Sequence, residues 1–174
     1  PHHPLLGRLA GSASWFAETD LNADVTIGGD TNGIAVGLSG RTNGSVLAAD
    51  LAMPALFELT GQREFSLSGT LENDEGATLL GQVGLDPLPL GNDGAARLAF
   101  DVNQRGGDPA SLNLAYTTER TDMRAQGHVS LAAEGFGSGD IRLSVDSENI
   151  EPYLLMNGIG LPQFGRGLPV RLAA

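Results

Sequence analysis

The residues of this chain best suited to acid–base or metal chemistry are its three histidines, His2, His3 and His128. His2 and His3 stand in a proline-flanked terminus, where we expect no positioned partners. His128 shares its parity in an alternating segment with Arg124 and Gln126, which predicts a solvated side chain on the polar face of a strand. A general base or metal ligand needs positioned partners, and no carboxylate recurs beside His128 at metal-ligand spacing. We therefore predict no catalytic histidine and no metal site.

Grouped carboxylates are the second candidate for catalysis. Glu72, Asp74 and Glu75 fall in a predicted turn, where Asn and Asp side chains serve backbone geometry. Asp101 and Asp146 lie on the outward parity of predicted strands. A glycosidase-like pair meets only in space, so the pattern leaves one open. It favours a protein that is not an enzyme.

Two Gly-Asp phrases are weakly similar to calcium-binding nonapeptide repeats. They contain Asp30, within Gly28–Gly33, and Asp140, within Gly137–Leu143. Such repeats bind calcium when they stack in tandem, whereas these two phrases are more than 100 residues apart. The chain also lacks a Walker loop, a dinucleotide fingerprint and a Gly-x-Ser-x-Gly elbow, so we expect no cofactor.

The elements that carry these polar residues are predicted to be strands. Apolar residues alternate with Thr, Ser, Asn, Asp or Arg, which is typical of half-buried antiparallel strands. Short connections rich in Gly, Asn and Asp predict hairpins between successive strands. The alternating apolar residues are, along the chain, Leu21, Ala23, Val25 and Ile27; Ile34, Val36 and Leu38; Leu47, Ala49 and Leu51; Phe65, Leu67 and Leu71; Val83 and Leu85; Leu98, Phe100 and Val102; Leu112, Leu114 and Tyr116; Met123, Ala125, Val129 and Leu131; Ile141, Leu143 and Val145.

Two apolar interruptions predict short helices. Met53–Gly61 and Ile150–Gly158 each carry Pro near the start and Gly at the end, the asymmetry expected of a helix. Leu85–Gly91 is a degenerate version of the same phrase. We predict a mainly β fold: an antiparallel meander that forms a curved, groove-like or sandwich-like sheet with two short helical plugs. Residues 1–20 are interpreted as an irregular lead-in or tag remnant, and residues 21–174 as one repetitive domain of a longer protein.

Net charge and amino-acid composition limit the classes of molecule that the chain is expected to bind. Among 174 residues, 21 acids oppose 10 arginines, and the net charge of −11 disfavours nucleic acid as a partner. The absence of Cys excludes disulfides and thiolate chemistry. No segment has the roughly 18 consecutive apolar residues of a membrane-spanning helix. With only 5% aromatic residues, the apolar parity is aliphatic, which suits either an ordinary core or a surface for acyl chains.

Several phrases of the chain resemble the AsmA-like proteins of Gram-negative bacteria. The longest runs from Asp146 through Pro152 and Leu155 to Pro162 and resumes at Leu168–Leu172. The leucine-serine-glycine strands Val36–Gly40 and Phe65–Leu71 are similar to recurrent strands of that family. The resemblance covers most of the chain from Leu21 onward.

The resemblance implies a repetitive β-sheet groove in the periplasm, attached to the inner membrane by a helix outside this chain. It implies a part in phospholipid transport to the outer membrane and in envelope integrity, with no catalytic residues. The expected partners are phospholipid acyl chains and flanking segments of the same chain. A closed β-sandwich acting as an interaction or adhesin-like surface module is the alternative. The residues expected to face lipid or core are Leu67, Leu71, Val83, Leu98, Phe100, Leu112, Leu114, Val129, Leu131, Leu143, Val145 and Leu155.

Overall fold

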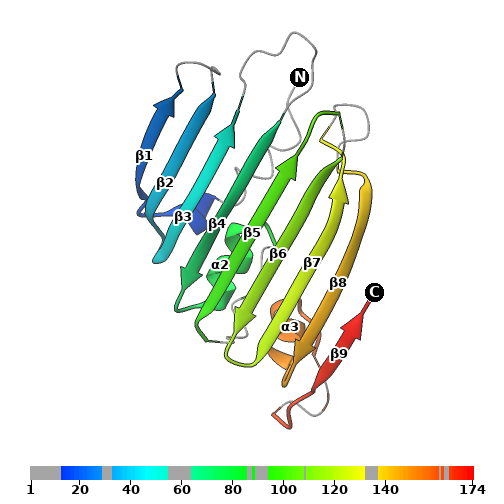
Figure 1. Cartoon of the computed structure of the whole chain (residues 1–174). Coiled ribbons are helices and arrows are strands. Elements are labelled where there is room, and N and C mark those ends of the chain that lie inside the picture. Colours follow the sequence, from blue (N-terminus) through cyan, green and yellow to red (C-terminus); the bar gives the residue numbers. More distant parts are fainter. Residues whose placement is uncertain are drawn as a thin grey trace, which may run out of the picture.

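Nine antiparallel strands form one open, uncurled sheet, in which each strand pairs with the next along the chain (Figure 1). The computed structural model describes residues 13–28, 33–54, 64–85, 88, 94–107, 109–131, 137–160, 162 and 165–174. The elements are η1 (Ala13–Phe16), β1 (Asp20–Ile27), β2 (Ile34–Thr42), β3 (Ser45–Met53), β4 (Phe65–Asn73), α2 (Gly76–Gln82), β5 (Ala96–Gln104), β6 (Ala110–Thr118), β7 (Thr121–Val129), β8 (Gly139–Ser147), α3 (Glu151–Met156) and β9 (Val170–Ala173).

The predicted mainly β, antiparallel meander is confirmed. Of the sandwich-like arrangement there is no sign in the described ranges, which contain a single sheet. The alternation explains the pairing, because the register keeps apolar residues of neighbouring strands on one face: Leu67 lies opposite Leu51 on one side and Val102 on the other. We call this side of the sheet the apolar face and the other the polar face.

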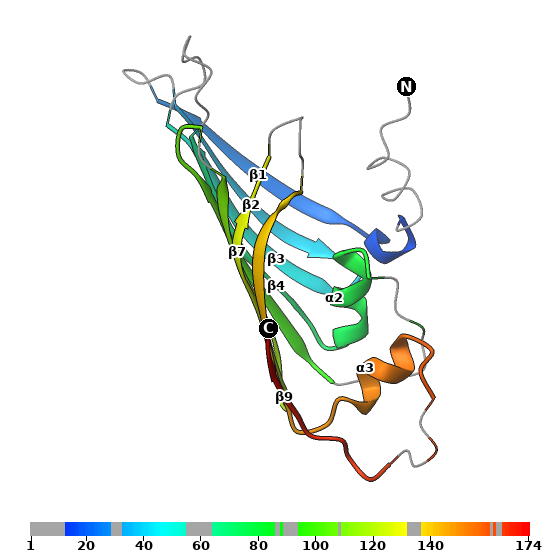
Figure 2. The same cartoon turned by 90° about the vertical axis from the view of Figure 1, so that its right-hand side faces the viewer.

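Both helices lie over the apolar face, near one end of the strands (Figure 2). α2 follows β4 and α3 follows β8, with four strands, β5 to β8, between the two helices. Because β4 and β8 run in the same direction, both helices begin at the same end of the sheet. α2 packs against β4, β5 and η1. Leu79 of α2 is fully buried, in a cluster with Leu71, Ala96, Tyr116 and Tyr153. The rings of Tyr116 and Tyr153 meet edge to face at 6.2 Å between centroids, which joins β6 to α3.

The helix predicted at Ile150–Gly158 is confirmed as α3, with Pro152 in its first turn and Gly158 in a left-handed conformation after its end. For the helix predicted at Met53–Gly61, Met53 is instead the last residue of β3, and residues 55–63 lie outside the described part. Most of the degenerate phrase Leu85–Gly91 also lies outside it. Residues 1–20 are predicted to be an irregular lead-in. Of these, the described residues 13–20 form η1, a short connection and the first residue of β1.

The strand predicted around Val83 and Leu85 is wrong, because α2 occupies the preceding residues and Val83 caps its end. The helix begins after an Asx turn in which the side-chain oxygen of Asn73 accepts the N–H of Glu75 at 2.7 Å. Gly76 then lets the helix approach the sheet, since a Cβ there would lie 2.5 Å from the Tyr116 hydroxyl oxygen. Residues Asn73–Gly76, which the sequence predicts to be a hairpin turn, therefore lead into a helix.

Gly81 of α2 lies beneath the indole of Trp15, and a Cβ there would come within 2.3 Å of the ring. Alanine normally stabilises a helix relative to glycine by about 1 kcal/mol. We expect Gly81→Ala to do the opposite and to lower stability by about 1–3 kcal/mol, because the ring must move. Trp15 is the only tryptophan, so its emission spectrum reports the displacement directly.

The matched control is Gly107→Ala, since nothing lies within 4 Å of a Cβ at that position. It should leave both the melting temperature and the emission spectrum unchanged. An unshifted Trp15 spectrum in Gly81→Ala would contradict the packing of η1 on α2.

Candidate functional site

The apolar face is the most extensive candidate site, and it is assembled from all nine strands. One row across the sheet illustrates how the face is built, because the strand register aligns one residue from each of eight strands. The row ends at Leu143, which exchanges two backbone hydrogen bonds with Ala174. Its side chains are small or aliphatic, apart from one phenylalanine. The row consists of Ala23, Leu38, Ala49, Gly69, Phe100, Leu114, Ala125 and Leu143.

Charge is absent from this face in every strand that the structure describes. Its large apolar side chains are aliphatic or methionine except for the aromatic Phe65, Phe100 and Tyr116. The ring of Phe100 covers the glycine at position 69. A Cβ on Gly69 would lie 2.6 Å from Cζ of Phe100, so the glycine makes room for the ring. The surface can therefore exclude water from an apolar ligand but offers little for recognition of a polar one.

The face divides into a covered end and an open end. At the covered end, α2 and α3 bury the cluster around Leu79, and Leu47, Leu98 and Met123 pack against it. Toward the other end and the sheet edges, apolar side chains are exposed: Val25 is 59% exposed, Ile27 72% and Leu143 43%. Among the described residues, the helices thus protect only part of the apolar surface (Figure 2).

A network of buried and half-buried polar side chains closes the covered end beside α2. Ser45, at the start of β3, donates to the side-chain oxygen of Gln82 at 2.8 Å. The side-chain nitrogen of Gln82 donates to the carbonyl oxygens of Trp15 and Thr42 at 3.0 and 3.1 Å. Asn73 donates to Ser45 at 2.8 Å. The network ties α2 to η1 and to the β2–β3 hairpin, and it satisfies polar groups removed from water.

A second polar network fixes α3. The side-chain oxygen of Asn149 accepts the N–H groups of Glu151 and Leu168 at 3.1 and 3.0 Å. Glu151 is buried, and its carboxylate accepts the N–H of Gly165 at 3.1 Å. This carboxylate therefore holds the loop that leads into β9, a structural role.

Nine of the twelve residues predicted to face lipid or core lie on the apolar face, brought together by strand register. Leu131 follows the end of β7, Leu155 is half-buried on α3, and Val83 stands outside the sheet at the end of α2, 49% exposed. The nine are Leu67, Leu71, Leu98, Phe100, Leu112, Leu114, Val129, Leu143 and Val145.

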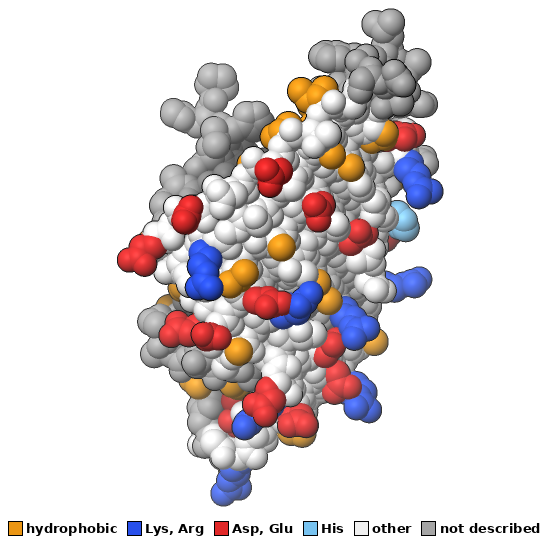
Figure 3. All heavy atoms as spheres, turned by 60° about the vertical axis from the view of Figure 1, so that its left-hand side comes forward, with side chains coloured by type: hydrophobic (Ala, Val, Ile, Leu, Met, Phe, Trp, Pro, Cys, Tyr) orange, Lys and Arg blue, Asp and Glu red, His pale blue; other side chains and the backbone are white. Residues whose placement is uncertain are grey.

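The polar face carries acids and arginines interspersed with one another (Figure 3). Among the described residues, the exposed ion pairs on this face include Arg97 with Glu72, Arg124 with Asp122 at 2.8 Å, and Arg171 with Asp146 at 3.0 Å. The bidentate contact with Asp122 raises the pKa of Arg124 above its ordinary value, through the hydrogen bonds and the attraction of the carboxylate. Exposed pairs of this kind contribute little stability, and we assign them to solubility.

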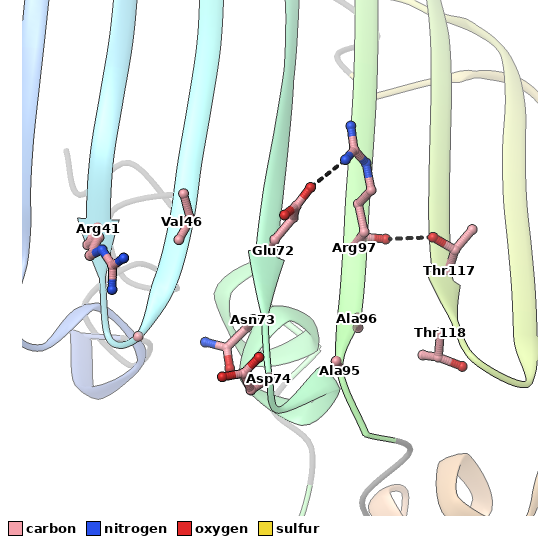
Figure 4. Close-up of a pocket in the computed structure, with 11 residues that line it drawn as sticks. Arg41, Val46, Glu72, Asn73, Asp74, Ala95, Ala96, Arg97, Thr117 and Thr118 are labelled. Carbon is pink, nitrogen blue, oxygen red and sulfur yellow. Dashed lines mark hydrogen bonds and ion pairs between the residues drawn. The ribbon is translucent and has the colours of Figure 1, made fainter.

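A shallow depression of about 530 Å³ lies on the polar face near the covered end. Figure 4 shows Glu72 reaching toward Arg97 from the neighbouring strand, and Thr117 donates to the Arg97 carbonyl oxygen at 3.5 Å. Of the grouped carboxylates, Glu72 is therefore paired, while Asp74 stands at the β4–α2 turn and Glu75 occupies the N-cap position of α2 without a capping hydrogen bond from its side chain. Glu72 and Asp74 both line the depression, and the carboxylate of Glu72 is engaged by Arg97.

The structure places Asp140 directly across from His128, and Ser111 on its other side. These three residues line a polar depression of about 770 Å³ with Arg105. The sequence did not predict that these residues are neighbours, because only the register of strand pairing brings them together. In this arrangement the Ser111 hydroxyl donates to the carbonyl oxygen of Asn103 at 3.3 Å, and the His128 side chain is exposed.

The described residues contain no group of three or more His, Cys, Asp or Glu able to hold a metal ion. Asp140 of the second Gly-Asp phrase lies in β8, and Asp30 of the first lies outside the described residues. None of the helices described is long and apolar enough to cross a bilayer.

The chain matches no family model, no curated protein and no solved structure. Its resemblance to AsmA-like proteins stays a hypothesis that rests on the sequence phrases quoted above.

Proposed function

We propose that this chain is a non-enzymatic segment of an AsmA-like envelope protein, whose apolar face binds the acyl chains of phospholipids. The observation that carries the proposal is an uncharged, largely aliphatic sheet face that no second sheet covers among the described residues. In this proposal the segment lies in the periplasm, and the membrane anchor belongs to a part of the protein outside this chain.

Aliphatic side chains suit a ligand that must move. Each methylene of an acyl chain transferred from water to such a surface gains about 0.8 kcal/mol, wherever along the surface it lies. A ligand that interacts nearly equally with Leu67, Val102 and Leu112, which share one row, meets no deep trap as it passes from strand to strand. Among the described residues, the two helices close one end of the face, and in this proposal the uncovered remainder takes the lipid.

The chemistry of the polar face is consistent with this arrangement. Its ion pairs and scattered acids keep the opposite side of the sheet hydrated, so that the two faces meet different environments. The alternative of a closed sandwich needs a second sheet over the apolar face. The described residues supply none.

The proposal predicts that the purified chain binds phospholipid. Native mass spectrometry should detect co-purified phospholipid, and a fluorescent fatty acid should bind saturably and be displaced by added phospholipid. The physical reason is the exposed aliphatic surface near Val25, Ile27 and Leu143. A lipid-free mass together with no binding of the fluorescent fatty acid would contradict the proposal.

A further inference from the structure

In the part of the chain that the structure describes, one edge of the first strand, β1, is unpaired. β1 is eight residues long, every one of them is exposed, and in the described part of the chain it has a single neighbour, β2. It contains no proline and no glycine, and it pairs with β2 along its whole length without a bulge. A long and regular edge of this kind is a template for a further strand.

Hydrogen-bond phase shows which backbone groups face the free side. Gly28 N–H donates to the Gly33 carbonyl oxygen at 2.9 Å, one position beyond the Ile27–Ile34 pair. Because hydrogen-bonded and non-hydrogen-bonded pairs alternate in antiparallel ladders, the even-numbered residues of β1 bond to β2. The N–H and C=O groups that point to the free side belong to Leu21, Ala23, Val25 and Ile27.

The side chains of β1 define what could pair there. Leu21, Val25 and Ile27 continue the apolar face to its margin and are 40–72% exposed. On the polar face β1 carries Asp20 and Asp24, four residues apart, and no basic residue. An added strand that places arginine or lysine opposite these two acids gains attraction across the strands, whereas an acid there is repelled.

The same acids argue against a second copy of this chain. Two β1 strands side by side bring together edges that carry only acidic charges, from molecules of net charge −11 each. Charged side chains on an edge strand commonly prevent such self-pairing.

We propose that β1 is the docking edge for an extended basic peptide segment, which adds to the sheet as a further strand. Its alternate residues are apolar and extend the apolar face beyond Leu21 and Val25. The intervening residues include arginine or lysine opposite Asp20 and Asp24. This inference does not depend on lipid binding.

The test uses the whole chain and a fluorescently labelled eight-residue peptide in which valine alternates with threonine and arginine, its two arginines four residues apart. We expect saturable binding by fluorescence anisotropy, with amide shifts in NMR spectra concentrated at Leu21–Ile27. A peptide with glutamate in place of arginine should bind at least tenfold more weakly. Sedimentation velocity of the unliganded protein should show a monomer.

Two variants separate edge pairing from other modes. Val25→Pro removes an N–H that faces the free side, so it should leave the β1–β2 ladder intact and weaken the peptide at least tenfold. Asp24→Lys should shift the preference toward the glutamate peptide, whereas Asp50→Lys, an equal charge change on β3 of the same face, should not.

Failure of the wild-type protein to bind the arginine peptide would overturn the proposal. Equal binding by Val25→Pro would also overturn it and would place the peptide on the apolar face instead. A β1-mediated dimer, abolished by Val25→Pro, would assign the edge to a second copy and overturn the choice of partner.

Discussion

Replacing Leu79 by alanine is expected to lower the free energy of unfolding by about 2–5 kcal/mol. The truncation removes most of a large aliphatic side chain and leaves a cavity among the residues that contacted it. Leu79 is 0% exposed, and its neighbours come from β4, β5, β6 and α3. A domain of ordinary stability, about 5–15 kcal/mol, would lose a large share of it. Urea unfolding followed by circular dichroism measures the change.

The control is Val83→Ala, which shortens a 49% exposed side chain at the end of the same helix. Its effect should stay within about 0.5 kcal/mol, as for most surface changes. If the two variants unfold at the same urea concentration, α2 is not part of the cooperative unit, and the cluster around Leu79 is not the core.

The strands were predictable because alternation is a local signal. Leu112, Leu114 and Tyr116 share a parity in the sequence and a face in β6, and the same holds for Leu98, Phe100 and Val102 in β5. The pairing of β1 with β2, of β2 with β3, of β5 with β6 and of β6 with β7 followed as well, since short polar connections join these strands. The pairing of β4 with β5 and of β8 with β9 did not follow from this argument, because a helix stands between the strands of each pair. The strand predicted at Val83 and Leu85 was wrong, because two apolar residues of one parity are too few to distinguish a strand from the end of a short helix.

The position of α2 was not predictable by the same argument. Asn73 and Gly76 favour a turn in the sequence, and only the approach of Gly76 to Tyr116 and of Gly81 to Trp15 shows why a helix follows. α3 was easier, because Pro152 and Gly158 mark both of its ends. A helix whose glycines serve packing leaves no such signal.

The limits of the site prediction have the same origin. Alternation identifies the side of each strand that avoids water, but it does not say what covers that side. Likewise, Asp140 lies beside His128 only because β8 pairs with β7 in one register. Spacing along the chain contains no trace of that contact.

The covered end of the apolar face and its exposed part around Leu143 should respond differently to an introduced carboxylate. Leu71→Asp, beneath the helices and 8% exposed, should unfold the chain, because a carboxylate there has neither water nor a partner. Leu143→Asp lies 43% exposed at the open part, so the chain should stay folded while the affinity for the fluorescent fatty acid falls by about tenfold or more, roughly 1.4 kcal/mol. Thermal melts and binding titrations measure the two effects.

Ser144→Asp is the matched control, since it adds the same charge one residue along β8, on the polar face. It should change neither folding nor binding. Unfolding of Leu143→Asp with an intact Ser144→Asp variant would mean that the open part of the face is a core, and would favour the closed alternative. Because Leu143 and Ser144 differ in the face they occupy and not in their distance from the edge, a difference between them isolates the apolar face as the binding surface.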